Sequence, residues 1–131
     1  KLDFSMNGAS DNKGKIESDS LFLAIEGAID FESELTVNYL KIKLDGVSEL
    51  ELSGKATSLD LTQDGITKLK AKKLDLTYAR VQIDGISKAT INPTNSLTGK
   101  VNGLSKLKYA TKPKKLLIQT EDGAKSKRSI L

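Results

Sequence analysis

Residues 40–52, LKIKLDGVSELEL, contain the pattern that decides the fold. Apolar and charged side chains alternate on both sides of the Asp45-Gly46 pair, with the period of two that is typical of β-strands. The apolar positions are Leu40, Ile42, Leu44, Val47, Leu50 and Leu52, with Glu49 and Glu51 outside. The stretch therefore predicts two short strands joined by a sharp turn.

The same turn recurs along the whole chain. A glycine that follows Asp, Asn or Glu returns at intervals of 18 to 20 residues, and a leucine stands six residues before most of these glycines. Because glycine adopts positive φ without a steric penalty, we expect each of them to form a corner. The column comprises Gly8, Gly27, Gly46, Gly65, Gly85, Gly103 and Gly123.

The length of the repeat selects the architecture. A third, weaker apolar segment, as at Leu35 and Val37, gives three short strands for about 19 residues. This is too short for a propeller blade, which needs about 40 residues, but it fits one coil of a parallel β-helix. Coils of that kind stack at about 4.8 Å, so that like residues lie above like. We expect an all-β fold, a parallel β-helix (β-solenoid) of about seven coils.

The 131 residues predict one domain over residues 1–131. Because Leu2, Phe4 and Met6 already fit inward positions, we expect this domain to lack an N-terminal portion, or a second copy to cover its open first coil. Residues 1–65 carry a net charge of −7 and residues 66–131 one of +11, which makes head-to-tail contact attractive. We expect residues 125–131 to form a basic C-terminal tail.

The composition excludes several kinds of active site. The chain has no histidine and no cysteine. This excludes Ser-His-Asp triads, Cys-His nucleophiles and zinc sites built from either residue. No apolar run approaches the roughly 20 residues of a membrane helix, so no transmembrane segment is expected. We predict a protein that is not an enzyme and has no cofactor.

Outward positions after the turn change from acidic to basic along the chain. Glu49 and Glu51 are followed one coil later by Lys68 and Lys70, so each Glu–Lys pair should lie side by side across one rung. The sequence favours a solubilising face that prevents lateral association of sheets. A polyanion-binding surface is the alternative. It would consist of Lys68, Lys70, Lys88, Lys106 and Lys108.

Acidic residues precede four successive glycines, at Glu26, Asp45, Asp64 and Asp84. Carboxylates stacked at rung spacing repel one another, and calcium accepts carboxylate oxygens. The column lacks the denser Gly-Gly-x-Gly-x-Asp pattern of calcium-binding repeats. The favoured interpretation is that these residues form turns and point into water, with no metal bound.

The sequence offers only a few candidate residues for a glycosidase, a sugar-binding or a nucleic-acid-binding site. A glycosidase needs two carboxylates about 5–9 Å apart, for which Asp60 and Asp75 near Arg80 are the best candidates. The favoured interpretation is that both are solvated outward positions. Tyr39 and Tyr78 share a column and could form part of a sugar platform. Nucleic acid is not an expected partner, because arginine forks and aromatic stacking platforms are scarce.

The repeated element resembles a known family. Asp45-Gly46-Val47-Ser48 and Asp84-Gly85-Ile86-Ser87 are similar to the repeat of the putative auto-transporter adhesin, head GIN domain family. Residues 101–113, VNGLSKLKYATKP, resemble the closing segment of that family, although Thr111-Lys112 replaces the glycine before its proline. The resemblance implies a right-handed, single-stranded β-helix on a secreted or cell-envelope protein of a Gram-negative bacterium. It implies no catalytic residues.

The sequence and the resemblance together predict a non-enzymatic, adhesin-like module that binds through the faces of its β-helix. Cell-surface or anionic glycans are the expected partners, and self-association through the open N-terminal coil is a further expectation. One alternative is a carbohydrate-active β-helix protein, either an enzyme of the polysaccharide lyase or glycosidase type or a glycan-binding module. A self-assembling scaffold is another.

Overall fold

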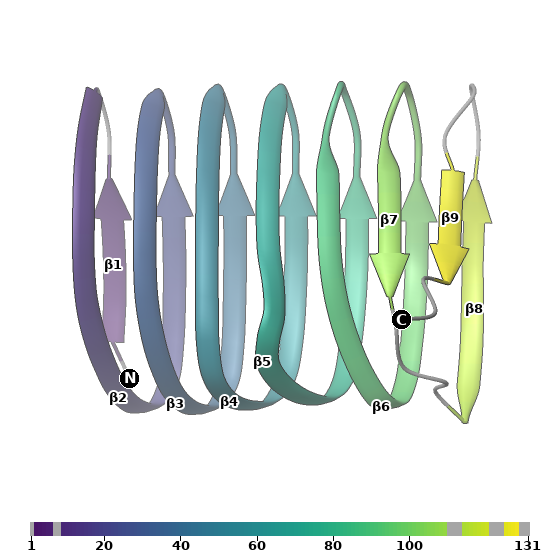
Figure 1. The fold of residues 1–131 in the computed structure, drawn as a ribbon, viewed down its shortest axis with the longest axis horizontal. Helices are drawn as coiled ribbons and strands as arrows, with labels where there is room; N and C mark the ends of the chain where they lie inside the picture. Colours follow the sequence, from purple (N-terminus) through teal and green to yellow (C-terminus); the bar gives the residue numbers. More distant parts are fainter. Residues whose placement is uncertain (1, 7–8, 110–113, 121–124, 129–131) are drawn as a thin grey trace.

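The computed structural model describes the backbone of residues 2–6, 9–109, 114–120 and 125–128, and the side-chain surroundings of residues 15–109 and 114–120. Its strands follow one another as a coil along the long axis of the molecule (Figure 1). They are β1 (Leu2–Met6), β2 (Ala9–Ile25), β3 (Ala28–Leu44), β4 (Val47–Gln63), β5 (Ile66–Ile83), β6 (Lys88–Val101), β7 (Lys106–Tyr109), β8 (Lys115–Thr120) and β9 (Lys125–Arg128).

All pairings between these strands are parallel. The order is β1 to β7 and then β9, and β8 pairs with β6. This confirms the predicted β-solenoid. It has about five turns and not seven, because short strands at the two ends make only parts of coils. The described residues contain no helix that could span a membrane.

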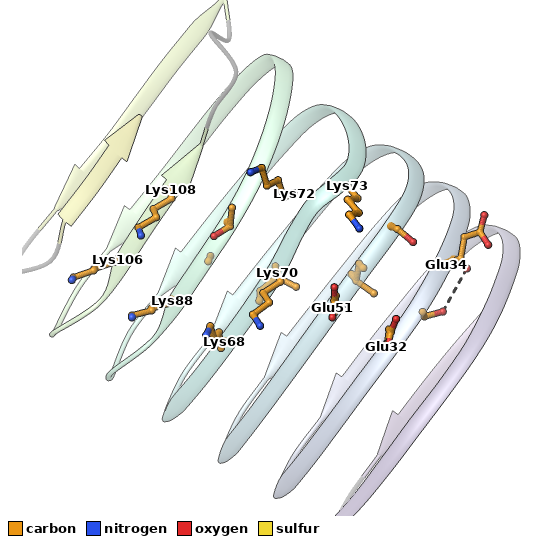
Figure 2. Close-up of a pocket in the computed structure, with 16 residues that line it drawn as sticks. Glu32, Glu34, Glu51, Lys68, Lys70, Lys72, Lys73, Lys88, Lys106 and Lys108 are labelled. Carbon is orange, nitrogen blue, oxygen red and sulfur yellow. Dashed lines mark hydrogen bonds between the residues drawn. The ribbon is translucent and has the colours of Figure 1, made fainter. Parts of the chain in front are cut away.

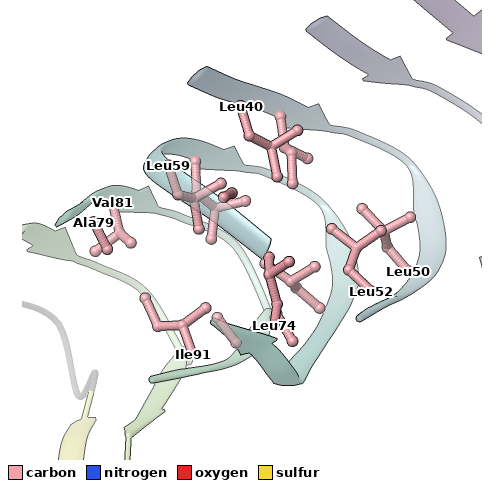
Figure 3. Close-up of a cluster of buried hydrophobic side chains, with 14 of the residues drawn as sticks. Leu40, Leu50, Leu52, Leu59, Leu74, Ala79, Val81 and Ile91 are labelled. Atoms are coloured by element: carbon pink, nitrogen blue, oxygen red, sulfur yellow. The ribbon is translucent and has the colours of Figure 1, made fainter. Parts of the chain in front are cut away.

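Successive coils are in register residue by residue. Leu21 lies beside Leu40 in the next coil, and Leu40 lies beside Leu59 in the one after. An offset of 19 residues places like side chains above like, as the repeat predicts. The inward leucines, isoleucines and valines form one continuous core along the axis, part of which is shown in Figure 3.

The expected division of each coil into three short strands is wrong. Each of β2 to β5 is a single strand of 17 or 18 residues. In β3 the alternation of buried and exposed residues is interrupted once, where Asn38 and Tyr39 both face outward. The strands stay unbroken because every coil is hydrogen-bonded to a neighbour of the same shape, and the ladder continues around the bend.

The position of Val47 also differs from the expectation. Val47 is 60% exposed, whereas Ser48 is 5% exposed and points inward. The Ser48 hydroxyl lies 3.1 Å from both the Gly27 carbonyl oxygen and the Asp45 carbonyl oxygen and donates to these acceptors. Because the turn reverses the alternation, a hydroxyl closes the Gly46 corner from inside. Thr67, Ser87 and Ser105 occupy the same buried position in later coils.

The glycine corners stack directly on one another. Gly46 has φ of 82°, and a Cβ atom there would lie 2.7 Å from the carbonyl oxygen of Gly27. At Gly65 the corresponding distance, to the carbonyl oxygen of Gly46, would be 2.6 Å. Glycine is therefore required for close approach as well as for its dihedral angle. Gly27, Gly85 and Gly103 also have positive φ, and Gly8 and Gly123 lie outside the described residues.

Candidate anion-binding groove

A groove of about 690 Å³ crosses the outward side of several coils, from β3 to β7. Figure 2 shows charged side chains along it, with glutamates on the coils nearer the N-terminus and lysines on the coils nearer the C-terminus. Seven lysines and three glutamates line it, so the groove is basic overall. They are Lys68, Lys70, Lys72, Lys73, Lys88, Lys106, Lys108, Glu32, Glu34 and Glu51.

Every lysine that the sequence assigned to a polyanion surface lies in this groove. Lys68, Lys88 and Lys106 are register partners in three successive coils. Adjacent rungs are about 4.8 Å apart, so like charges face each other at the distance where cross-strand repulsion destabilises a sheet. Lys108 lies in the next row, opposite Thr90. The solenoid thus arranges cations in a line along its axis.

This line continues in the backbone register of the last strand. Lys125 is the partner of Lys106, and Lys127 is the partner of Lys108. Within residues 125–131, for which the sequence predicts a basic C-terminal tail, Lys125–Arg128 forms strand β9 of the sheet. By backbone register, lysine positions therefore continue one strand beyond the described lining of the groove.

An ion pair marks the boundary between the acidic and the basic coils. Glu49 is the register partner of Lys68, and Glu51 that of Lys70, as expected. The salt bridge is nevertheless diagonal, with the Lys70 Nζ 2.9 Å from the Glu49 Oε1. The hydrogen bond from Lys70 lowers the pKa of Glu49, and the charges of Lys70 and Lys68 add to this effect against partial desolvation. The same hydrogen bond raises the pKa of Lys70.

Two lysines of the groove, Lys72 and Lys73, were missed by the sequence reasoning. They lie where β5 has one residue more than β4: Glu51 pairs with Lys70, but Ser53 pairs with Lys73. The signal was present in the sequence, because Gly65 and Gly85 are 20 residues apart where the three preceding intervals are 19. An extra residue of this kind is a β-bulge, which redirects side chains.

The acidic column beside the glycines has a structural use. The carboxylate Oδ1 of Asp45 accepts a hydrogen bond from the Gly46 N–H at 2.7 Å, and Asp64 accepts one from the Gly65 N–H at 2.8 Å. Asp84 accepts a hydrogen bond from the Asn102 side chain. Among the described residues, which include Glu26, no three acidic side chains converge as a metal site would require. The hydrogen bonds of Asp45 and Asp64 give these two carboxylates a role in the turns.

The structure does not bring the two candidate catalytic carboxylates together. Asp60 is the register partner of Arg80, whereas Asp75 is the partner of Lys55. Asp75 lines a second groove with Lys55, and Asp60 is not among the residues of either groove. The corner at Tyr78 lies between the two segments of β5 that hold Asp75 and Arg80.

The two tyrosines of the shared column are partly exposed on a corner. Tyr39 and Tyr78 are 43% and 45% exposed. Ser58 lies between them, as the register partner of both. They are therefore two rungs apart, about 10 Å, and do not form a continuous aromatic surface.

Comparisons with known proteins agree with this architecture. Residues 1–113 match the family described as putative auto-transporter adhesin, head GIN domain. The fold is similar to the crystal structure of a putative adhesin from Bacteroides fragilis NCTC 9343, with a TM-score of 0.76 and 22% identity. The similarity covers 95% of this chain and 61% of that one, so this chain spans about three fifths of its length. None of the curated proteins matches the sequence. The family match extends over most of the sequence, and the chain belongs to the putative auto-transporter adhesin, head GIN domain family.

Proposed function

We propose that this chain is a non-enzymatic, extracellular adhesin-like module that binds anionic polysaccharide of a cell surface in its lysine-lined groove. The observation that carries the proposal is the row of Lys68, Lys88 and Lys106 in register on successive coils. Like charges stacked in this way are unfavourable by themselves and become favourable when a polyanion lies along them. Family membership supports the adhesin class and a location at or beyond the cell surface.

A linear acidic polysaccharide fits the geometry of the row. It carries its charges on successive sugar rings, and one ring is similar in length to a rung spacing of about 4.8 Å. Duplex DNA carries one negative charge per about 1.7 Å of its axis, a spacing that the rungs do not match. Among the described residues that line the groove there is no aromatic side chain and no arginine, the groups on which single-stranded nucleic acids stack.

The direct experiment compares two variants that remove the same charge. Lys68→Ala/Lys88→Ala takes two cations from the groove, whereas Lys43→Ala/Lys100→Ala takes two exposed cations from the other side of the coil. We expect wild-type protein to bind heparin, with an affinity that falls as salt rises. The groove variant should bind at least several-fold more weakly and the control variant almost normally. Absence of heparin and polyuronate binding by the wild type would refute the proposal, as would equal losses in the two variants.

A second candidate, self-association, rests on the N-terminal edge of the sheet. Strand β1 pairs only with Leu21–Ile25 of β2. Within the described part of the chain, the edge of β2 from Ala9 to Ser20 has a partner only on its β3 side. Exposed strand edges pair readily with other chains. We propose that the acidic N-terminal coils of one molecule meet the basic C-terminal coils of another.

A further inference from the structure

The coil formed by β5 is stepped relative to both of its neighbours, at the upper rim of the groove. Between the pairs Ala71–Ile91 and Leu76–Pro93, β5 has four residues where β6 has one, Asn92. On the other side, two residues of β5 face Leu52 alone, between the pairs Glu51–Lys70 and Ser53–Lys73. At this corner β5 therefore has extra residues that the regular repeat does not contain, and we call residues 72–75 the ledge.

Side chains of β6 hold this ledge in place. The Asn92 Nδ2 donates a hydrogen bond of 3.1 Å to the carbonyl oxygen of Lys72, and the Thr94 Oγ1 donates one of 3.1 Å to the carbonyl oxygen of Leu76. These two side chains supply donors where the backbone ladder is interrupted. A bulge with its carbonyl groups bonded in this way is a stable feature of the fold.

The step changes the direction of the lysines. Ala71 and Leu74 are buried, and Lys72 and Lys73 between them are both exposed, whereas regular strands alternate. Figure 2 shows Lys73 directed down toward the row that holds Lys70, and Lys72 directed along the rim toward β6. One coil thus contributes Lys72 and Lys73 to the groove, besides Lys70, which is ion-paired with Glu49, and Lys68 at its lower edge.

We propose that Lys72 and Lys73, joined by Lys70 once its exposed ion pair with Glu49 is exchanged for the ligand, form a subsite for a tetrahedral oxyanion ester, sulfate or phosphate, attached to the polysaccharide. This inference rests on the proposed function. Each ammonium carries three N–H donors on a flexible stem and acts as a point charge. Three of them can address three oxygens of an ester that stands away from the sugar ring, whereas a carboxylate offers two oxygens. The regular lysine row binds any polyanion, and the lysines of the ledge distinguish a sulfate or phosphate ester on the polysaccharide from a carboxylate.

The test uses three dextrans of matched length and matched total charge at the pH of the assay: dextran sulfate, dextran phosphate and carboxymethyl dextran. Their common backbone isolates the charged group. We expect wild-type protein to bind at least one ester polymer on the order of tenfold more tightly than the carboxylate polymer, equivalent to one charge-assisted hydrogen bond. The relative affinities of the sulfate and phosphate polymers identify the ester.

Two double variants separate the ledge from the row. Lys72→Ala/Lys73→Ala should bring the ester-to-carboxylate affinity ratio close to one. Lys106→Ala/Lys108→Ala removes the same charge from the regular lysine positions of β7 and should weaken the binding of all three polymers by similar factors, leaving the ratio unchanged. Deletion of Lys72, which restores the 19-residue interval between Gly65 and Gly85, should also remove the preference. Thermal unfolding of each variant checks that the solenoid is intact.

An unchanged ratio in a folded Lys72→Ala/Lys73→Ala variant would overturn the subsite, as would a wild-type preference for carboxymethyl dextran. Either result would leave the proposed function standing, because the row would still bind polyanions. Failure of the wild type to bind any of the three dextrans, heparin or polyuronate would refute the proposed function itself.

Discussion

At the scale of single residues, the glycine corners are the most sharply constrained positions. Gly46→Val and Gly65→Val each place a β-branched side chain at positive φ, with Cβ less than 3.0 Å from the backbone of the preceding coil. We expect each to lower the free energy of unfolding by about 1–3 kcal/mol or more. Thermal or urea unfolding measures this. Val47→Ala, at the next and exposed position, is the control, and wild-type stability of both valine variants would contradict the corner geometry.

The ion pair between Glu49 and Lys70 makes a prediction about pH. The pKa of Glu49 is below its ordinary value, so its stabilising contribution is present above about pH 4.5 and is lost as pH falls through the lowered pKa. The pKa of Lys70 is raised, so its contribution is present below about pH 10.5 and is lost as pH rises further. Both side chains are exposed, and the effect should be small and screened by salt.

The measurement is the unfolding temperature of wild type and of Glu49→Gln from pH 2 to pH 8 at low salt. We expect a small deficit of the variant at neutral pH that disappears at the acid end, when Glu49 is protonated in both states. Glu34→Gln is the control at another acidic residue of the groove. A deficit that persists at pH 2 would show that the glutamine acts through packing and not through charge.

The prediction that the protein is not a glycosidase or lyase can be tested at Asp60 and Asp75. Their segments lie on different sides of the Tyr78 corner, so we expect that they do not act as a carboxylate pair on one glycosidic bond. We expect no hydrolysis or elimination from a panel of simple glycosides and acidic polysaccharides, measured by release of reducing ends and of unsaturated uronate. Turnover that Asp60→Asn or Asp75→Asn abolishes would overturn this prediction.

At the scale of the element, a column of buried hydroxyls closes the turns between strands. The Ser87 Oγ lies 3.0 Å from the Thr67 Oγ1 and donates a hydrogen bond of 2.9 Å to the carbonyl oxygen of Asp84. Ser87→Ala removes these partners from a buried site and should lower the free energy of unfolding by about 1–2 kcal/mol. Ser58→Ala, at a partly exposed position, should have a much smaller effect in the same urea titration. Equal effects would contradict the role of the column.

At the scale of the whole molecule, the solenoid turns a charge gradient in the sequence into a gradient along an axis. Because each coil stacks on the previous one, the acidic residues 1–65 and the basic residues 66–131 lie toward opposite ends (Figure 1). We expect head-to-tail association at low ionic strength that decreases at high salt, when the charges are screened. Light scattering at several protein concentrations measures it. A strict monomer at high concentration and low salt would contradict the proposed contact.

The repeat by itself determined the class of the fold. Two features set the fold: the alternation of apolar and polar residues within one coil, and the contact of each coil with the next. The first turns leucines such as Leu21, Leu40 and Leu59 inward, and the second stacks the corners at Gly46 and Gly65. Both are visible in the sequence, because in a solenoid each repeat packs only against its neighbours. The alignment of the lysines of the row could be predicted for the same reason. A residue one repeat later in the sequence lies at the same position in the next coil.

Departures from the repeat were decided only by the tertiary structure. The side to which Val47 and Ser48 point depends on how a turn reverses the alternation, and the partner of Glu49 depends on long side chains that can reach more than one rung. The direction of Lys72 and Lys73 depends on how an extra residue in β5 meets a shorter corner in β6. The conformation of a bulge depends on the hydrogen bonds that the coils on both sides offer to it. The interval between two glycines shows that a residue has been added but does not specify these hydrogen bonds.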